Sequence, residues 1–142
     1  MRRNKTGRMR KAGLVCIMAA LCLLLCFFCS CSREEDQAVS ELEYTVVPEE
    51  ELPEELKTII DEKKTGEFKL TYVDGEYLYI AVGYGKQTTG GYSIQIPRVY
   101  LTEDSIVFES QLMGPGEDAR ANISYPYAVI KTEKRQEPVI FK

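Results

Sequence analysis

The sequence contains no histidine and no tryptophan, and none of its five cysteines lies beyond Cys31. Without histidine, Ser-His-Asp and Cys-His catalysis are excluded, and the commonest zinc ligand is missing. Without cysteine after residue 31, that part of the chain has no disulfide and must fold around a hydrophobic core. Its carboxylates form solvated runs without EF-hand spacing, so we expect no catalytic residues, no metal and no cofactor.

Basic residues are scarce in most of the chain. The first 31 residues hold six of the 18 basic residues and none of the 22 acidic ones, which leaves a net charge of −10 for the remainder. Phosphate binding needs a concentrated positive face. We therefore expect no nucleic-acid partner.

Residues 1–31 have the pattern of an export signal. Six basic residues precede an uncharged apolar run, Ala12–Cys29, and this order is typical of secretion. The tetrapeptide Phe28-Cys29-Ser30-Cys31 resembles a bacterial lipobox, although its first position has phenylalanine where leucine is usual. The resemblance implies cleavage before Cys31 and acylation of this cysteine, for example with palmitate, and the alternative is an uncleaved N-terminal transmembrane anchor. Either outcome holds the rest of the chain at the outer face of the cell membrane.

Beyond the leader, the composition predicts a short tether and one domain. Residues 32–43 (SREEDQAVSELE) are polar and acidic, which is typical of a solvated tether. Residues 44–142 have the length of a single small extracytoplasmic domain. Within them, Pro53 can begin a helix, and apolar residues at positions 56, 59 and 60 fall on one helical face. We expect a helix over residues 54–64 that packs on a sheet.

From residue 67 onward, apolar and polar residues alternate, which predicts strands. Asp74-Gly75 lies between two such runs and indicates a hairpin. Pro97 is expected to end a strand that begins near residue 92. Further strands are expected around residues 106–108, 123–131 and 138–141. The predicted fold is α+β or mainly β, as a small antiparallel β sandwich or partly open barrel of about six strands with one N-terminal helix.

Three segments carry a family resemblance: Tyr79–Pro97 (YIAVGYGKQTTGGYSIQIP), Gly114-Pro115-Gly116 and Ser124–Val129 (SYPYAV). Together they resemble the C-terminal domain of the protease complex subunit PrcB family, over about residues 68–142. Members of this family are exported lipoproteins, and the member that gave it its name is associated with a surface protease complex. The resemblance implies a non-enzymatic lipoprotein whose partner is an exported protein, such as a protease.

A weaker resemblance concerns three loops of chagasin-type inhibitors of cysteine proteases. Thr88–Tyr92, Gly114–Gly116 and Tyr125–Tyr127 occur in the order of those loops, although Gln87 stands where the inhibitors have proline, an extra glycine is present, and Tyr125 replaces an arginine. The resemblance implies that the three segments cluster at one end of a sandwich. The predicted partner-binding residues are Thr88, Thr89, Gly90, Gly91, Tyr92, Gly114, Pro115, Gly116, Tyr125, Pro126 and Tyr127.

Each of these segments also has a purely structural interpretation. Thr88–Tyr92 can be a simple hairpin loop, Gly114–Gly116 a flexible turn, and Tyr125–Tyr127 an edge strand or bulge. The sequence is also compatible with two other functions. One is direct inhibition of an exported cysteine protease. The other is binding of cell-wall carbohydrate by exposed tyrosines of the hairpin region, unless the predicted helix covers them; these tyrosines are Tyr72, Tyr77, Tyr79, Tyr84 and Tyr92.

Overall fold

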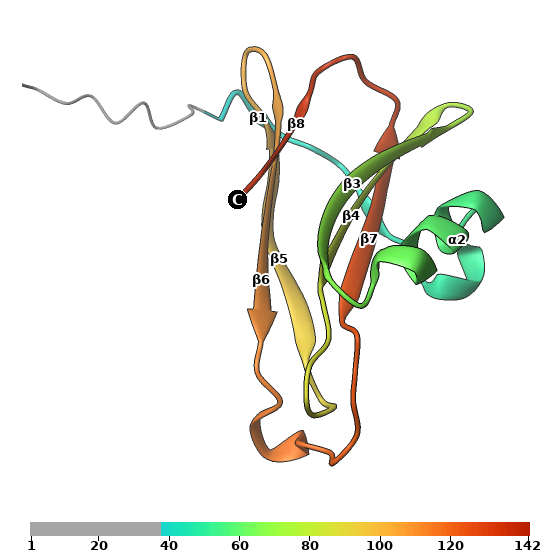
Figure 1. Cartoon of the computed structure of the whole chain (residues 1–142). Helices are drawn as coiled ribbons and strands as arrows, with labels where there is room; N and C mark the ends of the chain where they lie inside the picture. The colour runs from blue at the N-terminus through green and yellow to red at the C-terminus, as the bar shows by residue number, and fades with distance from the viewer. Residues whose placement is uncertain (1–37) are drawn as a thin grey trace, which may run out of the picture. The chain divides into compact units, whose positions relative to one another are not determined.

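The computed structural model describes residues 38–142, so the predicted leader with Cys31 and the first half of the tether, residues 32–37, lie outside the described residues. The described part has three layers, in which two β-sheets pack face to face and a helix covers the outer surface of one sheet (Figure 1). The predicted small β sandwich with one helix is confirmed, and the sheets do not close into a barrel. No helix within residues 38–142 is long and apolar enough to cross a membrane.

Each sheet has four strands. The first sheet, in the order β1-β5-β6-β8, comprises β1 (Ser40–Glu41), β5 (Ser93–Leu101), β6 (Ile106–Met113) and β8 (Val139–Phe141). The second sheet, in the order β2-β7-β4-β3, comprises β2 (Thr45–Val46), β7 (Tyr127–Glu133), β4 (Tyr77–Tyr84) and β3 (Glu67–Asp74). The helix α2 (Glu54–Lys63) agrees with the predicted range to within one residue, and short 3₁₀ turns occur at η1 (Glu49–Glu51) and η2 (Gly116–Asp118).

Strand β4 is buried on both faces because it lies between two apolar clusters. Leu78, Ile80 and Val82 face the first sheet, as their alternation predicted, and pack in the cluster that also contains Leu42, Val99, Ile106, Phe108 and Ile130. The intervening residues Tyr79 and Ala81 face α2 and pack in the second cluster with Val47, Leu52, Leu56, Ile60, Phe68 and Val129. The helix therefore buries the face of the second sheet that would otherwise be open to solvent.

Three details of the strands differ from the sequence predictions. Pro97 does not end β5, because it lies in a bulge between Gln95 and Arg98 and the strand continues to Leu101. The last strand, β8, pairs with β6 in parallel and not antiparallel. The strand expected over residues 123–131 is β7 and begins only at Tyr127, after a segment without strand structure.

The sheet begins before residue 44, where the sequence placed the start of the domain. Ser40 and Glu41 pair with Tyr100 and Leu101 of β5, and the side chain of Leu42 is only 9% exposed in the core between the sheets. The last residues of the expected tether are thus part of the folded domain.

Candidate functional site

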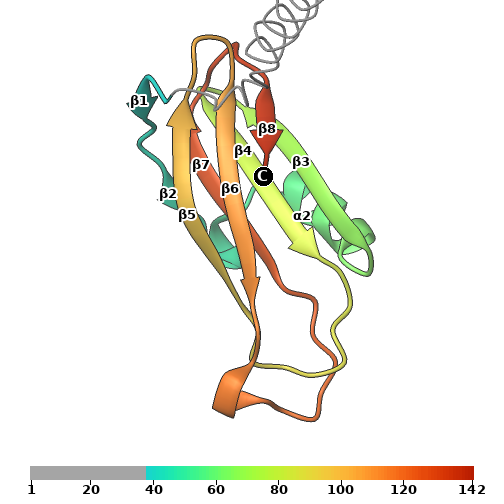
Figure 2. The same ribbon diagram turned by 90° about the vertical axis from the view of Figure 1, so that its left-hand side faces the viewer.

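Two long connections cross between the sheets at the same end of the sandwich (Figure 2). Residues 85–92 join β4 of the second sheet to β5 of the first, and residues 114–126 join β6 of the first sheet to β7 of the second. We call these two segments the crossover loops. All predicted partner-binding residues except Tyr127, the first residue of β7, lie in them.

Backbone hydrogen bonds join the crossover loops to each other. Gln87 and Ser124 form an isolated antiparallel bridge, with N···O distances of 2.8 and 3.2 Å, and Gly90 and Arg120 form a second one, at 2.9 and 3.4 Å. The Ser124 hydroxyl also donates a hydrogen bond to the Thr89 carbonyl at 2.7 Å. The Thr88–Tyr92 segment is therefore held by the other loop and is not a free hairpin tip.

The two adjacent glycines of this segment serve different purposes. Gly91 has a φ of +90°, a backbone conformation that favours glycine. Gly90 is buried, and the Asn122 side chain lies so close to it that an added Cβ would be 2.6 Å from Asn122 Oδ1. One glycine allows the chain to turn, and the other allows the two loops to approach closely.

The crossover loops present a mixed surface to solvent. Thr88, Gly91, Gly114 and Gly116 are exposed, while the side chains of Thr89, Tyr92 and Pro115 are half-buried. Ser93, the first residue of β5, pairs with Met113, the last residue of β6. Tyr92, which precedes β5, and Gly114, which follows β6, are therefore next to paired strand ends. The structure thus brings the Thr88–Tyr92 and Gly114–Gly116 segments to the same end of the sandwich, as the loop resemblance implied.

Comparison with known protein families locates a match over this part of the fold. Residues 78–133 match the PrcB C-terminal family. The match confirms the resemblance expected from the sequence, and it agrees with a subunit associated with a protease complex. It covers β4 to β7 with both crossover loops, which is less than half of the chain. No curated protein and no solved structure gives a significant match.

Within the PrcB-like region, the Tyr125–Tyr127 segment contacts both β4 and the helix layer. The Pro126 carbonyl accepts a hydrogen bond from the N–H of Tyr84 at 3.0 Å. The half-buried ring of Tyr127 packs against the cluster beneath α2, and its hydroxyl interacts with the Glu49 carboxylate. Burial, together with this carboxylate, raises the pKa of Tyr127 to about 12. Tyr127 therefore helps to hold the helix layer on the sheet.

The tyrosines of the hairpin region do not form an open binding face. Tyr79 is 7% exposed beneath α2, and the Tyr72 hydroxyl donates a hydrogen bond to Glu55 of α2 at 2.7 Å. The Tyr84 hydroxyl lies 2.9 Å from Ser110 Oγ of the opposite sheet. Tyr77 is 48% exposed, but it lies at the end of β4 away from the crossover loops. The alternative that the helix covers the tyrosine face is correct for Tyr72 and Tyr79.

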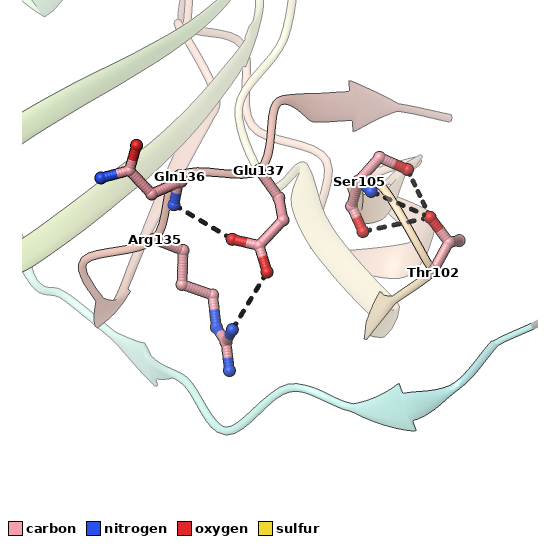
Figure 3. Close-up of polar contacts among 5 residues, drawn as sticks. All are labelled: Thr102, Ser105, Arg135, Gln136 and Glu137. Carbon is pink, nitrogen blue, oxygen red and sulfur yellow. Dashed lines mark hydrogen bonds and ion pairs between the residues drawn. The ribbon is translucent and has the colours of Figure 1, made fainter.

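The end of the sandwich opposite the crossover loops contains an open groove of about 870 Å³. Charges of both signs line it, from Glu41, Glu43 and Glu133 to Lys131 and Arg135. In two nearby turns, the polar side chains form hydrogen bonds or ion pairs with residues of the same turn (Figure 3). Arg135 pairs with Glu137 at 3.2 Å, and the hydroxyls of Thr102 and Ser105 lie 2.7 Å apart. In the part of the chain that the structure describes, no three acidic side chains gather as metal ligands.

Sequence reasoning missed the residues that hold the Thr88–Tyr92 segment in place. Ser124 and Arg120 lie about thirty residues further along the chain, and they reach the segment only because both loops cross the same end of the sandwich. One signal was available in the sequence, since Arg120 is the only basic residue between Arg98 and Lys131.

Proposed function

We propose that this chain is a membrane-tethered, non-enzymatic protein-binding module, and that its crossover loops dock an exported protein such as a protease. The observation that carries the proposal is the PrcB C-terminal match, which contains every predicted partner-binding residue. A lipid on Cys31 would supply the tether, because several acyl chains on one cysteine bind a membrane far better than a single chain does.

The position of β1 supports the choice of the crossover loops. The described chain enters the fold beside Leu101, at one end of β5, and the Thr88–Tyr92 segment precedes Ser93 at the other end of the same strand. Nine residues of strand span about 30 Å. A tether that enters through β1 leaves the crossover loops at the end of the domain furthest from its attachment, where a partner has access.

The proposal is tested by retention of envelope proteins on the full-length chain, solubilised in mild detergent and immobilised. Gly91→Val strains a backbone with a φ of +90°, and Tyr92→Ala removes the aromatic side chain that the loop offers to a partner, so both variants should lose the protein that wild type retains. Gly75→Val and Tyr77→Ala are matched controls, because Gly75 has a φ of +58° and Tyr77 is an exposed tyrosine, both in the hairpin at the opposite end. These controls should retain the partner.

Circular dichroism and thermal unfolding must show that each variant is folded. If wild type retains no protein, the binding function is wrong. If the loop variants retain the same protein as wild type, the function stands and its assignment to the Thr88–Tyr92 segment is wrong.

Direct inhibition of an exported cysteine protease is a second candidate. The observation in its favour is that the Thr88–Tyr92 and Gly114–Gly116 segments share one end of the sandwich, as in chagasin-type inhibitors. If this function is correct, a papain-like protease titrated with the chain loses its proteolytic activity in a stoichiometric manner. Unchanged activity throughout the titration would exclude it.

A further inference from the structure

The backbone of Arg120 is fixed by three hydrogen bonds. Its carbonyl accepts from the N–H of Gly90 at 2.9 Å and from the N–H of Asn122 at 2.8 Å, and its own N–H donates to the Gly90 carbonyl at 3.4 Å. The bare Cα of Gly90 permits this approach, since a Cβ there would meet the side chain of Asn122. Arg120 is thus a clamped position in an otherwise exposed loop.

The side chain of Arg120 is exposed between two small residues, Ala119 and Ala121, which are exposed as well. The other two arginines of residues 38–142 are engaged within the fold. The Arg98 guanidinium lies over the Tyr100 ring at 4.4 Å, and Arg135 pairs with Glu137. Arg120 has no ion pair, hydrogen bond or ring contact with any described side chain.

The charge of Arg120 also contrasts with its surroundings. The chain beyond the leader has a net charge of −10, and no other basic residue occurs between Arg98 and Lys131. A guanidinium forms two parallel hydrogen bonds with a carboxylate, and arginine is among the residues that dominate binding energies at protein interfaces. A fixed backbone reduces the entropy lost when such a side chain binds.

We propose that Arg120 is the anchor through which the crossover loops recognise their partner, and that the partner presents a carboxylate-lined pocket to it. This inference rests on the proposed binding function and specifies its chemistry. Because the Arg120 carbonyl already accepts two hydrogen bonds, its peptide bond is not free to enter the oxyanion hole of a protease. Arg120 therefore enters an acidic pocket as an anchor and not as the site of cleavage.

A defined probe for this chemistry is trypsin whose catalytic serine is replaced by alanine, because the specificity pocket of trypsin holds an aspartate. Binding to the full-length chain in detergent is measured by calorimetry. We expect Arg120→Ala to weaken binding at least about tenfold, which corresponds to about 1.4 kcal/mol, and Arg120→Lys to weaken it less. Arg135→Ala should bind as wild type does, and chymotrypsin, with its hydrophobic pocket, should not bind.

Equal binding of wild type and Arg120→Ala, or no binding of either, would overturn the assignment of Arg120. Active trypsin provides a further check, because rapid cleavage after Arg120 in the folded chain would show that its carbonyl is not clamped. In the retention experiment, Arg120→Glu should lose the partner. Undiminished retention by Arg120→Glu, with loss by Gly91→Val, would refute the role of Arg120 and leave the binding function intact.

Discussion

Two tyrosines bind the helix layer to the sheet through carboxylates. The Tyr72 hydroxyl donates a hydrogen bond to Glu55 of α2, and the Tyr127 hydroxyl interacts with the carboxylate of Glu49 in η1. Tyrosine combines a large apolar ring with one polar group, so it suits a boundary between a buried sheet face and an acidic, solvated helix. Residues that resemble a binding face in the sequence are structural here, because a helix from another part of the chain covers them.

The pKa of Tyr127 predicts a loss of stability at high pH. Burial and Glu49 raise this pKa from 10.0 to about 12 in the folded protein, while the unfolded chain releases the proton near the ordinary value. The stabilisation is therefore complete below pH 10 and is lost as the pH rises from about 10 to 12, because only the unfolded chain becomes ionised there. Urea unfolding at intervals across this range should show the free energy of unfolding falling.

Tyr127→Phe provides the control for this pH dependence. It should cost up to about 1 kcal/mol at neutral pH, because the interaction between this hydroxyl and the Glu49 carboxylate is lost, and the decline between pH 10 and 12 should become shallower. Absorbance titration of phenolate should lose its latest-ionising group in the variant. A wild-type decline that Tyr127→Phe leaves unchanged would contradict the assignment to Tyr127.

At the scale of elements, the β3–β4 hairpin depends on a glycine in the middle of a sheet. Phe68 of β3 lies opposite Gly83 of β4, and its ring covers the position that a side chain at residue 83 would occupy. An aromatic ring that packs over a glycine on the neighbouring strand compensates for the missing side chain. Phe68 is thereby buried beneath α2, although β3 is an edge strand.

Gly83→Ala is therefore expected to destabilise the domain by about 1–3 kcal/mol, the usual cost of overpacking. The added Cβ would lie 2.1 Å from Cε1 of Phe68, so the ring must move out of its cluster. Gly114→Ala is the matched control, since a Cβ there meets nothing within 4 Å and should change the free energy of unfolding by less than about 0.5 kcal/mol. Equal urea midpoints for the two variants would refute this account of the hairpin.

The elements that the sequence predicted well are those determined by local pattern. The helix follows from the spacing of Leu56, Ile59 and Ile60, and the hairpin from a glycine that takes a φ of +58°. The errors concern pairing. A proline such as Pro97 can end a strand or lie in a bulge, and only the neighbouring strand decides between them. The parallel direction of β8 likewise depends on where the chain returns.

At the scale of the molecule, the parts of the site that depend on adjacent residues could be predicted, and the parts that depend on contacts between distant segments could not. The Thr88–Tyr92 segment could be found because its glycines and threonines are adjacent in the chain. Its attachment to Ser124 and Arg120 requires that two connections cross one end of the sandwich, which no short motif encodes. The matched region spans both connections, so the family resemblance carried information that the spacing of residues did not.

The sandwich also depends on residues that look like a tether. The described residues belong to one compact unit, and within it Leu42 packs between the sheets while its N–H donates to the Val99 carbonyl at 2.9 Å. The N–H of Val39 likewise donates to the Leu101 carbonyl at 2.8 Å. These contacts cover the edge of β5 at the point where the chain enters the domain, so the residues next to the tether contribute to the stability of the fold.

A chain shortened to begin at residue 44 should therefore be less stable than one that begins at residue 36. Loss of the Leu42 side chain and of these hydrogen bonds should lower the free energy of unfolding by about 3 kcal/mol. Leu42→Ala in the longer chain should account for most of this loss, because it removes the buried side chain and leaves the backbone bonds in place. Urea unfolding measures all three chains. Equal midpoints for the two lengths would mean that β1 is dispensable and that the tether extends to residue 43.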